Sequence, residues 1–107
     1  MSQITTHVLD TSLGKPGQGI HISLQEQDDN EGWKTLASGI TNADGRIADL
    51  LSEGKILPPG HYRMHFDTGS YYKALHQDCF YPEVAIVFQV FDSSHYHVPL
   101  LLSLIHI

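Results

Sequence analysis

Histidine is the residue type that stands out in this chain, with eight copies among 107 residues. Its ordinary pKa near 6.5 lets it exchange protons close to neutral pH, and its neutral ring also binds metal ions. His95 and His97 would share one face of a strand, an arrangement that can ligate zinc. A zinc site needs a third protein ligand, and no carboxylate or thiol lies nearby at a suitable spacing. Acid–base chemistry, a metal site and structural roles therefore all stay open.

His7 differs from the other histidines because it interrupts an otherwise apolar alternation over Ile4–Asp10. The alternation places it on the face opposite Val8. Arg46 follows a tight turn over residues 42–45, where an exposed charge is common. Four further histidines are expected to face solvent or to end a helix, without a chemical role: His21, His61, His65 and His76.

Short alternating segments bounded by turn residues predict strands as the main elements. The expected strands are Ile4–Asp10, Gly19–Glu26, Trp33–Thr41, His61–Thr68, Val84–Phe91 and His95–Leu102, with a further short strand within Ile47–Ile56. Gly69–Gln77 is the one expected helix. About seven strands at this spacing predict an antiparallel β-sandwich, formed by one domain over residues 1–107.

Composition and charge exclude several classes of protein. A net charge of −6 with six Lys and Arg argues against a nucleic-acid partner, and no apolar run approaches the ~20 residues of a membrane helix. Cys79 is the single cysteine, which leaves no internal disulfide and no thiolate zinc site. The first residues lack the basic and apolar regions of a signal peptide. We expect a cytoplasmic protein, or a periplasmic one if a signal peptide has been removed.

Four separated segments carry recognisable motifs: residues 7–22 (HVLDTSLGKPGQGIHI), 41–46 (TNADGR), 80–84 (FYPEV) and 96–101 (YHVPLL). In this order they resemble the signatures of the transthyretin-like family, and the similarity runs up to about Leu101. The resemblance implies a transthyretin-like (prealbumin-like) antiparallel β-sandwich with one short helix, its last strand missing or replaced.

The family combines thyroid-hormone carriers with hydrolases of 5-hydroxyisourate, an intermediate of purine (urate) degradation. The carriers have Lys, Glu and Thr where this chain has His7, Arg46 and His97, and the hydrolases have His, Arg and His. The resemblance therefore implies hydrolysis of 5-hydroxyisourate to 2-oxo-4-hydroxy-4-carboxy-5-ureidoimidazoline, without a cofactor or a metal. The alternatives are a non-catalytic small-molecule binding protein, an inactive fragment of the hydrolase, or a metal-binding sandwich centred on His95 and His97.

The resemblance also implies where the site lies. In the family, four sandwiches assemble as a dimer of dimers, and the strands that bear His7 and His97 line a central channel with Arg46 at its mouth. His7 and His97 would then form the acid–base pair, and all three residues would bind the substrate, with Arg46 as its clamp.

The sequence departs from the family after residues 102–103. Hydrolases of the family continue with Pro and an aromatic-rich strand that ends in Tyr-Arg-Gly-Ser, whereas this chain reads Leu102–Ile107 (LSLIHI). We expect a truncated gene, since this hexapeptide is also the translation of a transposon adapter used in DNA library preparation, and His106 is not counted as a ligand or catalyst. Loss of the last strand would leave an apolar edge at His95–Leu102 that favours aggregation.

Overall fold

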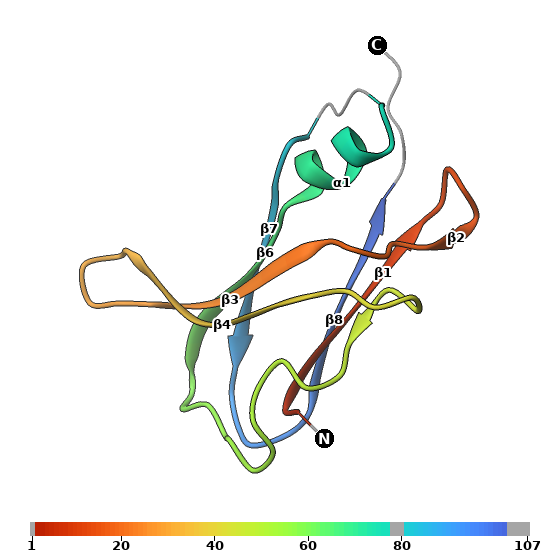
Figure 1. Ribbon diagram of the computed structural model, residues 1–107. Helices are drawn as coiled ribbons and strands as arrows, with labels where there is room; N and C mark the ends of the chain where they lie inside the picture. The colour runs from red at the N-terminus through yellow and green to blue at the C-terminus, as the bar shows by residue number, and fades with distance from the viewer. Residues whose placement is uncertain (1, 78–80, 103–107) are drawn as a thin grey trace.

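The computed structural model describes residues 2–77 and 81–102. Its elements, in chain order, are β1 (Ile4–Asp10), β2 (Lys15–Pro16), β3 (His21–Gln27), β4 (Trp33–Ile40), β5 (Arg46–Ile47), β6 (Gly60–Phe66), α1 (Thr68–Ala74), β7 (Val84–Val90) and β8 (Tyr96–Leu102). One sheet has the order β4-β3-β6-β7, and the other is built around β1 (Figure 1). The predicted β-sandwich with one short helix is therefore confirmed.

β1 is the strand that organises the second sheet. β8 pairs with it along its whole length, while β2 and β5 pair with different parts of it. The β1–β8 pair is parallel, whereas every other strand pair among the described residues is antiparallel. The predicted antiparallel sandwich thus contains one parallel pair, which the sequence did not indicate, because an alternating pattern fixes which face a side chain takes and not the direction of the neighbouring strand.

Alternation along the strands builds the core between the two sheets. In β1 the inward residues Ile4 and Val8 are fully buried, and in β6 Met64 and Phe66 are as well. The inward side chains of β7 and β8 follow the predicted pattern, with Val90 and Val98 among the buried residues. Burial of such side chains contributes roughly 1.5–3 kcal/mol each, so the core fixes the register of each strand.

Most predicted boundaries agree with the structure to within one or two residues, and the range Ile4–Asp10 agrees at both ends. The ambiguous segment 47–56 contains only the end of the two-residue strand β5. Tyr96 rather than His95 begins the last described strand. Within the described residues β8 pairs with β1 alone, while Cys79, Phe80 and the predicted tail over residues 103–107 lie outside them.

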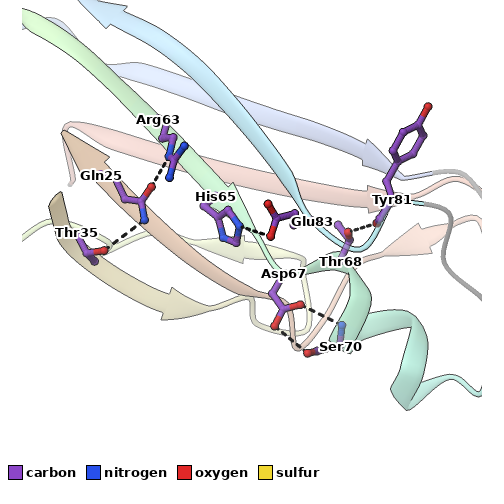
Figure 2. A network of polar contacts seen from close by, with 9 residues as sticks. All are labelled: Gln25, Thr35, Arg63, His65, Asp67, Thr68, Ser70, Tyr81 and Glu83. Atoms are coloured by element: carbon purple, nitrogen blue, oxygen red, sulfur yellow. Dashed lines mark hydrogen bonds and ion pairs between the residues drawn. The ribbon is translucent and has the colours of Figure 1, made fainter. Parts of the chain in front are cut away.

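The helix α1 is shorter than the predicted range 69–77. Asp67 caps its beginning, because its carboxylate accepts hydrogen bonds from the Ser70 backbone N–H and hydroxyl (Figure 2). Leu75 caps its end, and His76 follows with a φ of 57° in the left-handed region. The expectation that His76 would lie in the last turn of the helix was therefore wrong. The described residues include no helix long and apolar enough to cross a membrane.

The histidines expected to face solvent do so on the outer face of the β4-β3-β6-β7 sheet. His21 and His61 are exposed. Figure 2 shows His65 on the same face of β6 as Arg63, with its Nε2 atom 3.4 Å from the Glu83 carboxylate. These contacts are typical of a solvated sheet surface, and they confirm the interpretation of the three histidines.

The turn before β5 places Arg46 beside β1. The Asn42 side chain accepts hydrogen bonds from the backbone N–H groups of Asp44 and Arg46, and the Val8 N–H donates to the Gly45 carbonyl at 2.8 Å. Gly45 has a φ of 74°, and a Cβ atom there would lie 2.3 Å from the Val8 carbonyl oxygen. Only glycine combines this φ with so close an approach to β1.

Gly45→Ala is expected to destabilise the protein more than Gly54→Ala. Gly54 has a similar φ of 81°, but no atom lies within 4 Å of the position that a Cβ atom would take there, so its substitution should cost about 1–2 kcal/mol from the backbone conformation alone. Gly45→Ala adds a collision with backbone and should cost at least about 3 kcal/mol. Urea denaturation of both variants checks this, and equal losses would show that the close approach to β1 is not limiting.

Candidate active site

The β5-β1-β8 part of the second sheet brings the three predicted site residues onto one face. His7 is the register partner of Arg46 in the antiparallel β1–β5 pair, and Thr5 is that of His97 in the parallel β1–β8 pair. Cross-strand partners project to the same side of a sheet. Val8 and Val98, their neighbours along the strands, are buried on the opposite side. The prediction that His7 and His97 face away from the core is therefore confirmed.

A pocket of about 340 Å³ opens on this face. The residues that line it are Thr5, Thr6, Arg46, Ile47, Ala48, His95 and His97. Arg46 and His97 thus share one pocket, while His7 lies beside Arg46 on the same face without being among the lining residues. The pocket wall is apolar at Ile47 and Ala48, with a guanidinium and two imidazoles around it, which suits a small, flat, polar molecule.

Thr5 is a pocket residue that the sequence did not single out, and His95 was considered only as a candidate metal ligand. The Thr5 hydroxyl lies 2.9 Å from the His95 Nε2 atom and 2.9 Å from the His97 Nδ1 atom. Thr5 is an ordinary strand residue by type, so its role depends on the parallel register that places it beside His97. The shared face expected for His95 and His97 did signal that these two rings would be neighbours.

The pKa of His97 is lowered from its ordinary value of 6.5. The main cause is burial, which disfavours the charged imidazolium. The positive charge of Arg46, and those of His7 and His95 when protonated, lower it further. The ring of His97 is consequently neutral at pH 7, and it keeps an unprotonated nitrogen that can accept a proton from water.

Arg46→Gln is expected to raise the pKa of His97 because it removes one of the nearby positive charges, while burial keeps the value below 6.5. An NMR titration of the His97 ring, assigned by the loss of its signal in His97→Asn, measures this midpoint. Arg63→Gln on the other sheet is the matched control and should leave the midpoint unchanged. A midpoint that stays or falls in Arg46→Gln would contradict this account of the site.

The metal hypothesis for His95 and His97 required a third ligand. Within residues 2–77 and 81–102, no group of three or more His, Cys, Asp or Glu side chains is placed to hold a metal ion. The two imidazoles instead meet at the hydroxyl of Thr5.

The two-sheet fold, with an arginine and histidines on the outer face of one sheet, defines a transthyretin-like β-sandwich with a polar site on its surface. Residues 4–106 match the family model described as "Transthyretin: HIUase/Transthyretin family". The chain belongs to this family. The match continues past Leu101, where the resemblance of the motifs ended.

Proteins with similar sequences are named as hydrolases. The chain is 44% identical over 101 residues to the 5-hydroxyisourate hydrolase of Salmonella dublin, which covers 94% of this chain and 73% of that protein. It is 43% identical over 104 residues to the 5-hydroxyisourate hydrolase of Mus musculus, which covers 95% of this chain and 87% of that protein. Such identity over nearly the whole chain spans bacterial and animal proteins.

Solved structures with the same fold include both functional branches. Sea bream transthyretin in complex with thyroxine has a TM-score of 0.88 at 30% identity. The match covers 95% of this chain and 87% of the transthyretin chain. The 5-hydroxyisourate hydrolase of Klebsiella pneumoniae has a TM-score of 0.81 at 32% identity. The match covers 94% of this chain and 88% of the hydrolase chain. Backbone similarity therefore does not separate carrier from hydrolase, and the side chains of the site must do so.

Proposed function

We propose that this protein hydrolyses 5-hydroxyisourate in urate degradation. Relatives that carry this name match nearly the whole chain at 38–44% identity. The observation that carries the proposal is the placement of His7, Arg46 and His97 on one outer sheet face, with the last two in one pocket. These are the positions at which the resemblance distinguishes hydrolases from hormone carriers.

The reaction opens a ring by adding water to an acyl carbon and breaking its bond to nitrogen. A neutral imidazole takes a proton from water while the oxygen bonds to the carbonyl carbon, and the resulting imidazolium returns the proton to the departing nitrogen. His97 has the lowered pKa that suits the first step. We assign His7 and His97 as the acid–base pair, and this part of the proposal leaves open which of them begins.

Arg46 is proposed to clamp the substrate. Its guanidinium is always charged and presents several N–H donors in one plane, so it can bind the oxygens of a flat ring. The same charge stabilises the oxyanion that forms when water adds to the carbonyl carbon. Arg46 opposes His7 across the strand pair and lines the pocket with His97, which would place the bound ring between the two imidazoles.

His97→Asn is expected to lower kcat by about 10²–10⁴-fold, the usual contribution of general acid–base catalysis. The substitution keeps a polar side chain on the outer face of β8, so the fold should persist. Absorbance decay of freshly generated 5-hydroxyisourate measures the rate, with the spontaneous decay subtracted. His61→Asn, at an exposed position of the other sheet, is the matched control. Unchanged turnover in His97→Asn would remove this residue from the mechanism.

The same assay separates the alternative functions. A chelator should leave the rate of a cofactor-free hydrolase unchanged and would abolish that of a metal-dependent one. A carrier would bind the substrate without accelerating its decay. The solved complex of sea bream transthyretin with thyroxine gives the carrier a structural precedent in this fold. A wild-type chain that binds 5-hydroxyisourate without hydrolysing it would favour the carrier.

We also propose that the protein is a homotetramer, a dimer of dimers, that acts in the cytoplasm. The face that bears the site is flanked by exposed apolar side chains, Leu9 on β1 and Leu101 on β8, and Leu101 is 65% exposed. Apolar side chains beside a polar site are typical of a surface that other subunits cover. The site would then lie in a channel between sandwiches.

Leu101→Glu is expected to prevent this assembly because it would place four charges at the covered face. Sedimentation velocity should show a wild-type mass of about four chains and a smaller species for the variant. Ile56→Glu, at an exposed loop position, is the control that should keep the wild-type mass. A monomeric wild-type protein would overturn the tetramer.

A further inference from the structure

The Thr5 hydroxyl joins two imidazoles of the site. It lies 2.9 Å from the His95 Nε2 atom and 2.9 Å from the His97 Nδ1 atom, and all three residues line the pocket. The register pairing of Thr5 with His97 fixes this arrangement in the backbone of the sheet. His95, the other histidine that contacts Thr5, directly precedes β8.

Counting protons shows that the two rings cannot be independent. A hydroxyl has one proton to donate and can accept hydrogen bonds, and a neutral imidazole has one N–H and one bare nitrogen. If Thr5 donates to His97, then His95 must donate to Thr5. If His97 donates to Thr5, then the hydroxyl proton is free to be donated to His95. At most one of the two rings can therefore accept a hydrogen bond from Thr5.

We propose that Thr5 and His95 are positioning residues that hold His97 with its proton on Nδ1 and its Nε2 bare. This inference rests on the proposed hydrolysis, and it assigns to His97 the first step, in which a proton is accepted from water. Because Nδ1 is occupied by the contact with Thr5, Nε2 is the nitrogen left for the substrate side. It can accept a proton only if the ring's existing proton is on Nδ1.

This direction of hydrogen bonds also suits the charged ring. Once His97 has taken the proton, both of its nitrogens carry hydrogen, and Nδ1 continues to donate to Thr5. The hydroxyl continues to donate to His95, so nothing needs to rotate between the two proton transfers. With the opposite direction, Nε2 would already carry a proton and His97 could not act as the base.

His95 completes the arrangement by supplying the bare Nε2 that accepts from Thr5. It must be neutral to do so, because a protonated His95 carries hydrogen on both ring nitrogens and cannot accept from Thr5. The charged and titratable groups that act on His97 are Arg46 on β5, His7 on β1 and His95 itself. Positive charge on these groups disfavours a second proton on His97, which keeps its ring neutral at pH 7.

The test is ¹⁵N NMR of the histidine rings at pH 7, without substrate, in the wild type, Thr5→Val, Thr5→Ser and Thr35→Val. The wild type and Thr5→Ser should show His97 with its proton mainly on Nδ1. Thr5→Val keeps the β-branched shape but removes the hydroxyl, so His97 should shift toward the Nε2-protonated form. Thr35→Val, on the exposed face of β4, should resemble the wild type.

Kinetics give the second measurement. Thr5→Val should lower kcat by at least about 10-fold, part of the general-base contribution, with KM changed by less than about twofold. The acid limb of its pH profile should move to lower pH, because the charged ring of His97 loses the hydroxyl that accepts its Nδ1 hydrogen bond. Thr5→Ser should retain both the rate and the profile. A Thr5→Val enzyme with wild-type kcat and pH profile would overturn the proposal.

The two measurements distinguish a failure of the proposed function from a failure of the positioning role. A wild-type chain without hydrolysis would end the proposed function, while its ¹⁵N spectrum would still report the tautomer. If Thr5→Val does not fold, the wild-type spectrum decides. His97 found mainly with its proton on Nε2 in the folded wild type would overturn the role of Thr5 and His95, whatever the activity.

Discussion

The register of β1 is the constraint on which the rest of the structure depends. This strand pairs along its whole length with β8 and, over two residues, with β5. Its inward residues Ile4 and Val8 are fully buried, while its outward residues meet the site. A slip of one residue would exchange the two faces, placing His7 in the core and Val8 at the surface. Core packing and site geometry are therefore set by the same pairing.

Buried polar contacts reinforce this register. Thr6 is 1% exposed, and its hydroxyl donates to the Val98 carbonyl at 2.7 Å, which ties β1 to β8 from inside the sandwich. Asp10, also 1% exposed, accepts a hydrogen bond from the Tyr71 hydroxyl at 2.7 Å and joins the end of β1 to α1. Leaving such buried groups without partners would cost about 1–3 kcal/mol each, which penalises other registers.

The proposed mechanism places two electrostatic demands on the site. A substrate rich in oxygens favours the positive charge of Arg46, whereas a general base must stay uncharged. Partial burial of His97 and the neighbouring positive charge of Arg46 lower the pKa of His97, so the proposed clamp and the proposed base can coexist in one pocket. The proposed link through Thr5 adds a second control, over which nitrogen of the neutral ring is bare. Both controls use groups on β1, β5 and β8, together with His95 directly before β8.

The sequence predicted some elements and faces of the structure and missed others. Alternation predicted the range and faces of β1, because period-two burial is a local property of a strand. It also placed His21, His61 and His65 at the surface. The two-residue strands β2 and β5 were not predicted as such, because two residues are too few to show a period. The helix was expected to run through His76, but a local cap at Leu75 ends it earlier.

The sequence by itself determined the sandwich and, through the resemblance at His7, Arg46 and His97, the choice among the family's functions that we propose. Tertiary structure alone decided that β8 lies parallel to β1, since strand direction depends on how the intervening chain returns. That decision set Thr5 beside His97 and made the threonine part of the site. Alternation along one strand carries no information about which strand will be its neighbour, and so no local pattern could have selected Thr5.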